Sequence, residues 1–207
     1  MLSKIYLITL LISSLISIYN YNKLTTYLKA FSIFLVVTLV VECAGYFLIK
    51  PNIWLFNIFT ALEFVFYLVL FRQILTSTSK KKAVNLLIAS TIIASLGNMI
   101  FFQGLFKFNN YSYSYGCMLV CICVMMYFLQ LLHHTNPQPL TRIPMFWVST
   151  GLLIYYACNF FYMGLLNYII GVSMEIAKEL FIIISVLNIA MYSLFSVGIV
   201  CSTTRRR

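Results

Sequence analysis

Two glutamates stand inside long apolar stretches of this sequence, where an ionisable side chain is most able to do chemistry. Glu42 lies in TLVVECAGYFL and Glu63 lies in FTALEFVFYLVL. The only other acidic residues are Glu175 and Glu179, because the chain has no aspartate. A carboxyl in apolar surroundings must be protonated or find polar partners. Glu42 and Glu63 therefore indicate either a ligand or proton site or a polar contact that holds helices together.

Each of these glutamates is followed four residues later by a tyrosine, as Glu42/Tyr46 and Glu63/Tyr67. Residues at i and i+4 share one face of a helix, so the spacing predicts a phenol beside each carboxyl. Counted from Pro51 at about 1.5 Å per residue, Glu42 lies about 13 Å and Glu63 about 18 Å from a shared turn. The two carboxyls can then occupy one layer. We expect at least one of them to be protonated there, because like charges repel strongly in a low dielectric.

Amide side chains extend the polar set towards one end of the expected helices. Asn98, Asn159 and Asn188 fall in one half of the membrane or near its middle, whereas the other half holds mostly small hydroxyls. Any one asparagine is better explained as a helix-packing bond. Their shared depth nevertheless predicts a polar cup that is open on one side. The expected ligand or proton site consists of Glu42, Glu63, Tyr46, Tyr67, Asn98, Asn159, Asn188 and Tyr192.

Other catalytic and cofactor-binding patterns are missing from the sequence. His133 and His134 are the only histidines, and as neighbours on a helix they point about 100° apart, so one metal ion cannot easily take both. No aspartate is present to complete a zinc site or a Ser-His-Asp triad. P-loop, dinucleotide-binding and kinase motifs are also missing. We therefore expect neither an enzyme nor a bound metal or cofactor.

The elements that must position the polar residues are membrane-spanning helices. The chain is 62% hydrophobic and 9% charged, with a mean hydropathy of +0.97, whereas about 25% of residues are charged in soluble domains. Its apolar residues form blocks long enough for transmembrane helices, which need about 18 residues or more. The sequence predicts an all-α transmembrane bundle in a single domain, without a soluble domain. We expect about seven helices, at about 5–20, 27–49, 52–74, 83–104, 113–133, 144–166 and 171–201.

The 14 cations divide unequally between the two sides of such a bundle. Ten fall on one side, namely Lys23, Lys29, Arg72, Lys80, Lys81, Lys82, Arg142, Arg205, Arg206 and Arg207. The other four are Lys4, Lys50, Lys107 and Lys178. Lysine and arginine are retained on the cytoplasmic side, so we expect the N-terminus outside and the C-terminus inside the cell (inner) membrane. This orientation needs an odd number of helices and turns the polar cup outward.

The basic inner side carries two clusters, Lys80–Lys82 and Arg205–Arg207. They are the expected contacts with the membrane surface or with a cytoplasmic or membrane protein partner, although membrane topology alone also explains them. The net charge of +10 is not accompanied by an aromatic-and-basic recognition stretch, so we expect no binding of nucleic acid. The lipid bilayer is the expected partner, and an oligomer is possible.

The sequence resembles small seven-helix integral membrane proteins of bacteria. The resemblance extends over most of the chain and implies no activity. It is carried by Glu42, Leu62-Glu63, Phe146-Trp147 after Pro144, and Asn188 with Tyr192.

Two functions are compatible with these patterns. The first is a sensor or accessory binding module of a signalling system, with an outward-facing polar cup. The second is a transporter, channel or pore-forming effector, proton-coupled through Glu42 and Glu63. A permeation route should have polar lining in both halves of the membrane, so the one-sided cup favours the first.

Overall fold

The computed structural model describes residues 2–48, 52–133 and 139–204 of the chain. Within these ranges the chain forms seven α-helices and no strand, which confirms the predicted all-α class. The helices are α1 (Leu2–Tyr19), α2 (Thr26–Phe47), α3 (Ile53–Ile74), α4 (Thr78–Gly97), α5 (Asn110–His133), α6 (Pro144–Val172) and α7 (Met174–Thr204). Short 3-10 turns cover Tyr21–Lys23 and Leu140–Arg142, and a π-helical turn at Asn98–Phe102 follows α4.

Among the described helices, the six from α2 to α7 are long and apolar enough to span a membrane. The chain is therefore a multi-pass membrane protein. Helix α1 is shorter, and its 18 residues extend about 27 Å, compared with about 30 Å for the hydrocarbon core of a bilayer. Its crossing of the membrane stays a prediction.

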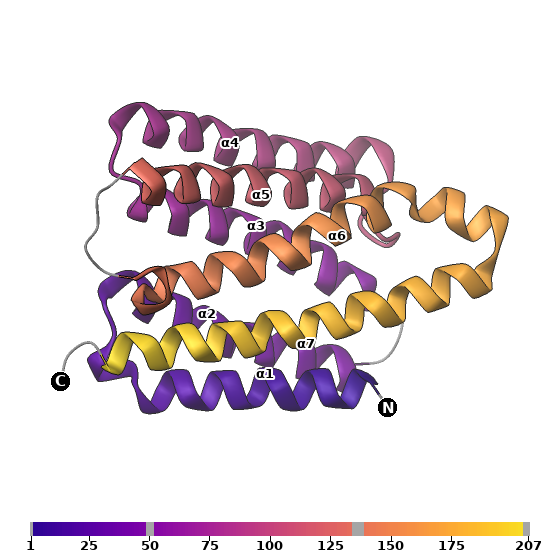
Figure 1. Ribbon diagram of the computed structural model, residues 1–207. Helices are drawn as coiled ribbons and strands as arrows, with labels where there is room; N and C mark the ends of the chain where they lie inside the picture. Colours follow the sequence, from indigo (N-terminus) through magenta and orange to yellow (C-terminus); the bar gives the residue numbers. More distant parts are fainter. Residues whose placement is uncertain (1, 49–51, 134–138, 205–207) are drawn as a thin grey trace.

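Six of the described helices form a ring in the order α1, α2, α3, α5, α6 and α7, and α7 packs back against α1. Helix α4 stands outside this ring, against α3 and α5 (Figure 1). The beginning of α1, the α4–α5 loop and the α6–α7 turn lie at one end of the bundle, which we call the N-terminal end (Figure 1). The end of α7 and the α3–α4 turn lie at the opposite, C-terminal end.

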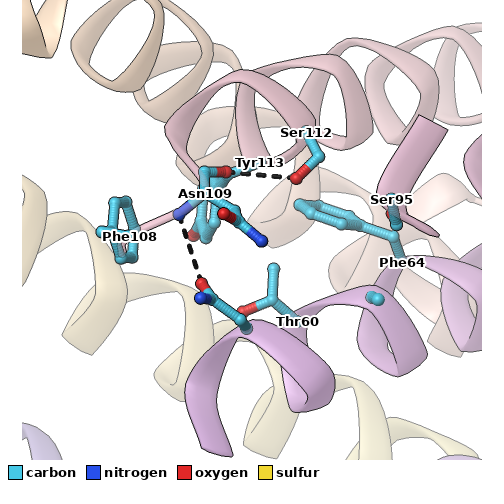
Figure 2. A pocket seen from close by; sticks show the side chains of 9 residues that line it. Thr60, Phe64, Ser95, Phe108, Asn109, Ser112 and Tyr113 are labelled. Carbon is cyan, nitrogen blue, oxygen red and sulfur yellow. Dashed lines mark hydrogen bonds between the residues drawn. The ribbon is translucent and has the colours of Figure 1, made fainter. Parts of the chain in front are cut away.

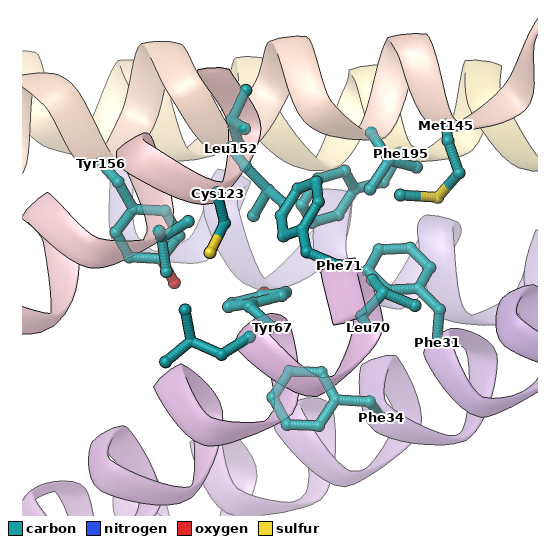
Figure 3. Close-up of a cluster of buried hydrophobic side chains, with 14 of the residues drawn as sticks. Phe31, Phe34, Tyr67, Leu70, Phe71, Cys123, Met145, Leu152, Tyr156 and Phe195 are labelled. Atoms are coloured by element: carbon teal, nitrogen blue, oxygen red, sulfur yellow. The ribbon is translucent and has the colours of Figure 1, made fainter. Parts of the chain in front are cut away.

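Packed aromatic side chains occupy the half of the ring near the C-terminal end (Figure 3). The rings of Phe31 in α2 and Phe195 in α7 meet edge to face with centroids 5.0 Å apart. Phe34 in α2 meets Tyr67 in α3 at 5.5 Å, also edge to face. Edge-to-face pairs at these distances are favourable. We call this half the closed half of the ring.

Close approach and hydrogen bonds hold α1, α6 and α7 together. A Cβ atom added at Gly198 in α7 would lie only 2.8 Å from the backbone oxygen of Pro144 in α6, so these helices touch through a glycine. The Ser13 hydroxyl of α1 bonds the Tyr192 backbone oxygen and the Ser196 hydroxyl of α7, each at 2.8 Å. Packing of this kind stabilises helix pairs in lipid, where the hydrophobic effect between helices is missing.

The turn expected at about 167–170 is helical in the structure, so that boundary is wrong. Helix α6 continues to Val172, and the chain turns at Ser173, whose backbone is extended (φ −160°, ψ 123°). A glycine inside a helix costs only about 1 kcal/mol relative to alanine, so Gly164 and Gly171 do not end α6. The long α6–α7 hairpin projects beyond the other helices at the N-terminal end (Figure 1).

Helix α4 begins at Thr78 rather than at the expected residue 83. Lys80–Lys82 therefore lie in its first turns and not in a loop. The residue types explain the earlier start, because serine is favoured just before a helix, as at Ser77, and lysine is a good helix former. The cluster Arg205–Arg207 and the break expected at Lys50-Pro51 lie outside the described residues.

Candidate functional site

A cavity of about 410 Å³ lies inside the helix ring, in the half near the N-terminal end. Every ring helix contributes to its wall, through Tyr6 (α1), Glu42 (α2), Glu63 (α3), Tyr113 (α5), Asn159 (α6) and Asn188 (α7) among others. Phe108, in the loop before α5, also lines the cavity, which therefore reaches the N-terminal end. Helix α4 contributes no lining residue among those described.

Glu63 is held by two phenols. The Tyr156 hydroxyl donates to Glu63 Oε1 at 3.0 Å, and the Tyr67 hydroxyl donates to the same oxygen at 3.4 Å. Tyr67 is on α3 one turn after Glu63, as the spacing predicted, whereas Tyr156 is on α6, so its bond also links two helices. Within the described chain no hydrogen bond reaches Glu63 Oε2. Since Glu63 lines the cavity, this second oxygen remains for a ligand.

Glu42 has its phenol partner on another helix. Tyr6 is the tyrosine whose hydroxyl acts on the Glu42 carboxyl, and both side chains line the cavity. Tyr46 is 70% exposed, and its ring packs against Phe47 with centroids 5.5 Å apart. Among the described residues Tyr46 makes no hydrogen bond to Glu42, and it does not line the cavity. A shared helix face does not fix where a side chain turns near a helix end, where packing decides its direction.

Asn159 and Asn188 place two unpaired amide oxygens at the cavity. Asn159 is fully buried and donates through Nδ2 to the Tyr155 backbone oxygen at 2.9 Å. Its Oδ1 has no hydrogen-bond partner among the described residues, and neither has the buried Oδ1 of Asn188. An unpaired buried acceptor is unfavourable by about 1–3 kcal/mol. Neither oxygen has accessible surface in this arrangement, so a ligand with hydrogen-bond donors would satisfy them after the two amide groups rotate towards the cavity that both residues line.

Asn98 does not line the cavity, so the structure does not bring it together with the other predicted site residues. It begins the π-helical turn after α4, and it donates to Gln103 Oε1 at 2.9 Å and to Ser112 Oγ at 3.2 Å. These bonds connect the end of α4 to the beginning of α5, outside the ring. The depth of a residue along a helix can be counted from the sequence, but the side of the bundle on which the helix stands cannot.

Tyr192 lines the cavity next to the closed half. It is almost fully buried, and its ring contacts Tyr6 at 5.9 Å and Phe195 at 5.6 Å between centroids. Tyr67 does not line the cavity in the structure and reaches it only through its bond to Glu63. The predicted residues that share the cavity wall are therefore Glu42, Glu63, Asn159, Asn188 and Tyr192.

Four further tyrosines at this site were not distinguished by any pattern in the sequence. Tyr6, Tyr113 and Tyr155 line the cavity, and Tyr156 holds Glu63. The chain has 15 tyrosines, a residue type that is enriched at membrane interfaces. Residue type alone therefore does not separate a cavity phenol from an interfacial one. The contacts that each tyrosine makes with other helices distinguish cavity tyrosines from interfacial ones.

A polar network fixes the loop that brings Phe108 to the cavity. The Asn57 amide of α3 donates to the backbone oxygens of Leu105 and Lys107 at 2.8 and 2.7 Å, and its oxygen accepts from the Asn109 backbone N–H at 3.2 Å. Figure 2 draws the hydrogen bond donated by the Asn109 backbone N–H as a dashed line. Phe108 and Tyr113, labelled in the same view, also line the cavity. The α4–α5 loop is thus fastened to α3 by hydrogen bonds between the Asn57 side chain and the loop backbone.

The charged groups of the cavity wall are all acidic. Glu42 and Glu63 are close enough for the charge of one to act on the other. No lysine, arginine or histidine occurs among the described lining residues. No group of three or more metal-binding side chains occurs among the described residues either. The cavity therefore presents carboxyl, amide and phenol oxygens together with aromatic faces.

The predicted basic contact surface lies at the opposite end of the bundle. Lys80 is partly buried, and its Nζ donates to the Met126 backbone oxygen at 3.3 Å. Arg72 donates from Nε to Asn85 Oδ1 at 2.6 Å, which joins α3 to α4. A role of Lys80–Lys82 in contacts with lipid or protein stays a prediction.

No protein-family model, curated protein or solved structure matches this chain. The fold and the cavity define it as a multi-pass helical membrane protein with a polar cavity in one half of its helix ring. Its function is therefore inferred from the chemistry of this cavity.

Proposed function

We propose that this protein is a membrane-embedded binding module, either a sensor or an accessory subunit, that takes a small ligand from the outer face of the membrane. The observation that carries the proposal is the cavity of about 410 Å³ in one half of the ring. Sites for small molecules have volumes of about 300–1,000 Å³ and combine apolar walls with a few polar groups. The lining of this cavity has that composition.

The contents of the closed half favour binding over passage. Leu28, Phe31, Phe71 and Phe195 are fully buried there. A route for a solute would need polar groups in this half as well. The packed rings instead form a floor beneath the cavity. The lining also lacks histidine, cysteine and lysine among the described residues, and the proposal includes no catalytic step.

The orientation of the cavity follows from the cations. The described cations at the C-terminal end are Lys23, Lys29, Arg72, Lys80, Lys81, Lys82 and Arg142. Those at the N-terminal end are Lys107 and Lys178, and position 4, also a lysine in the sequence, lies in the first turn of α1 at the same end. The excess of cations on cytoplasmic sides then turns the cavity outward in a bacterial cell membrane. The basic end would meet anionic lipid or a signalling partner in the cytoplasm.

Cysteines placed in the two halves of the ring test this proposal. Ser185 lines the cavity, whereas Ser149 is fully buried in the closed half. In liposomes that carry the protein in one orientation, we expect a membrane-impermeant thiol reagent to modify Ser185→Cys from the N-terminal side only. Ser149→Cys should react from neither side. The unsubstituted protein, with its six native cysteines, sets the baseline.

A transporter or pore would give a different labelling pattern. It would expose Ser149→Cys, or it would expose Ser185→Cys to reagent applied at the C-terminal side. Either result contradicts a binding module with a closed floor.

A further inference from the structure

The charge of the cavity wall limits the kind of ligand that it can hold. Both ionisable acids of the wall, Glu42 and Glu63, lack a basic partner among the described lining residues. The Tyr67 and Tyr156 hydroxyls both donate to Glu63 Oε1, which leaves Oε2 as the oxygen that can pair with a cation. An anionic ligand would be repelled by this wall. A cationic ligand would supply the missing positive charge.

The unpaired polar atoms of the wall add a second condition. Among the described residues, the buried atoms at the cavity that lack a partner are Asn159 Oδ1 and Asn188 Oδ1. Both are acceptors, and Asn159 is fully buried. A ligand that satisfies them must donate hydrogen bonds. A primary or secondary ammonium group has N–H donors, whereas a quaternary ammonium group has none.

The apolar part of the wall is largely aromatic. Phe56, Phe59, Phe108 and Phe181 line the cavity from α3, the α4–α5 loop and α7. An organic cation is attracted to the face of an aromatic ring within about 6 Å of its centroid. A hard metal ion such as Ca²⁺ instead requires about six to eight oxygen ligands, and these rings offer none. The wall therefore suits a cation with an apolar body.

From these three features we propose that the cavity binds a small organic amine, whose ammonium group lies between Glu42 and Glu63 and whose apolar body contacts the phenylalanines. This proposal rests on the proposed function and names the class of ligand for the same site. The Asn159 and Asn188 oxygens accept from the ammonium N–H groups. The carboxyls then act as the counter-charge of the ligand as well as contacts between helices.

Reagents of opposite charge test the proposal without a known ligand. Ser185→Cys is treated with a methanethiosulfonate that bears a trimethylammonium group and, separately, with one of similar size that bears a sulfonate. We expect the cationic reagent to react faster, by on the order of tenfold or more, because a cleft of one charge concentrates the opposite ion. This preference is measured relative to Ser193→Cys, and in Ser185→Cys/Glu42→Gln/Glu63→Gln the ratio of the two rates should fall to the ratio of that control.

A matched position on the same helix controls for intrinsic reactivity. Ser193 is exposed on the outer surface of α7, and it donates to the Ile189 backbone oxygen at 2.9 Å, as Ser185 donates to that of Phe181 at 2.8 Å. Ser193→Cys should show no preference that depends on the two glutamates. If Ser185→Cys does not fold, Met163→Cys offers a second lining position that loses no side-chain hydrogen bond.

Added compounds that occupy the cavity should protect the cysteine from the cationic reagent, and the extent of protection distinguishes primary from quaternary ammonium ions. Hexylamine is expected to slow the cationic reagent more than trimethylhexylammonium does, and hexanol should have little effect. A rate ratio at Ser185→Cys equal to that at Ser193→Cys would overturn the amine proposal and leave the binding cavity in place. Stronger protection by the quaternary ion would overturn the role of the N–H donors. A folded Ser185→Cys that reacts with neither reagent would contradict the proposed function itself.

Discussion

Glu63 serves two purposes in this structure. Its Oε1 accepts from Tyr67 on its own helix and from Tyr156 on α6, which is a contact between helices. Its side chain also lines the cavity. The two explanations offered by the sequence, helix contact and ligand site, are therefore compatible in one residue. Substitutions that keep one property and remove the other can separate them.

Replacement of Glu63 by glutamine and by leucine makes this separation. Glu63→Gln keeps an oxygen for Tyr156, so we expect thermal unfolding close to that of the parent protein but loss of the ligand response. Glu63→Leu leaves the buried Tyr156 hydroxyl unpaired and should destabilise the protein by about 1–3 kcal/mol. Thermal unfolding in detergent, measured with a binding assay, checks both. Full activity of both Glu42→Gln and Glu63→Gln would show that the carboxyls are only structural.

The phenol that serves Glu42 can be identified by paired substitutions. Tyr6 contacts Glu42 in the cavity, whereas Tyr46 is 70% exposed. We expect Tyr6→Phe to weaken ligand binding by about 0.5–1.5 kcal/mol, the usual contribution of one hydrogen bond. Tyr46→Phe should leave binding and stability unchanged. An equal effect of both substitutions on the dissociation constant would contradict this assignment.

The structure brings together part of the residue set that the sequence suggested for this site. Glutamates stand out in apolar helices, and a spacing of four residues did place Tyr67 beside Glu63. The same spacing did not bring Tyr46 to the cavity, where Tyr6 from a different helix acts on Glu42. Contacts between helices depend on packing, which local spacing does not encode.

Among the elements, the α6–α7 contact depends on a glycine. A Cβ atom at Gly198 would meet the Pro144 backbone oxygen at 2.8 Å, whereas nothing lies within 4 Å of a Cβ atom at Gly97. Gly198→Ala should destabilise the protein by about 1–3 kcal/mol through overpacking. Gly97→Ala should stabilise it by up to about 1 kcal/mol, because alanine favours a helix over glycine. Unfolding in detergent measures both changes, and the opposite order would contradict the packing.

Apolar blocks predicted that these helices exist but located some of their ends poorly. Pro144 marks the first turn of α6, as expected from its fixed φ and missing N–H. The glycines near the end of α6 did not mark its end, which is at Val172. The lysines after Ser77 did not mark a loop, because they continue as the first turns of α4. Residue type alone does not locate these ends, because a helix tolerates glycine and readily includes lysine.

For the whole molecule, the order of helices around the ring was not visible in the sequence. Helices α3 and α5 are not consecutive in the sequence, and they become ring neighbours because α4 stands outside, against both. For this reason Asn98, at the end of α4, does not line the cavity. The depths counted for the polar residues along their helices agree with a shared position in the structure, because such a count needs only the antiparallel order of the helices. Glu42, Glu63, Asn159 and Asn188 share one cavity from four different helices.

The orientation of the molecule is tested by cysteines at the two ends of α4. Phe106 is 71% exposed in the α4–α5 loop, and Ser79 is exposed in the first turn of α4. In intact cells we expect an impermeant maleimide to label Phe106→Cys and to miss Ser79→Cys until the cells are opened. The distribution of cations is the physical reason. Labelling of Ser79→Cys alone would reverse the orientation and turn the cavity toward the cytoplasm.

The most direct measurement is equilibrium binding of hexylamine to the purified protein, read as a shift in thermal unfolding and corrected with hexanol. At about ten times the dissociation constant, binding to one site adds about 1.4 kcal/mol of stability. We expect this stabilisation for the parent protein and for Ser193→Phe, which adds a ring outside the cavity. Ser185→Phe, which fills the cavity, and Glu42→Gln/Glu63→Gln should lose it. The same stabilisation in all four proteins, or in none of them, would contradict an amine site in this cavity.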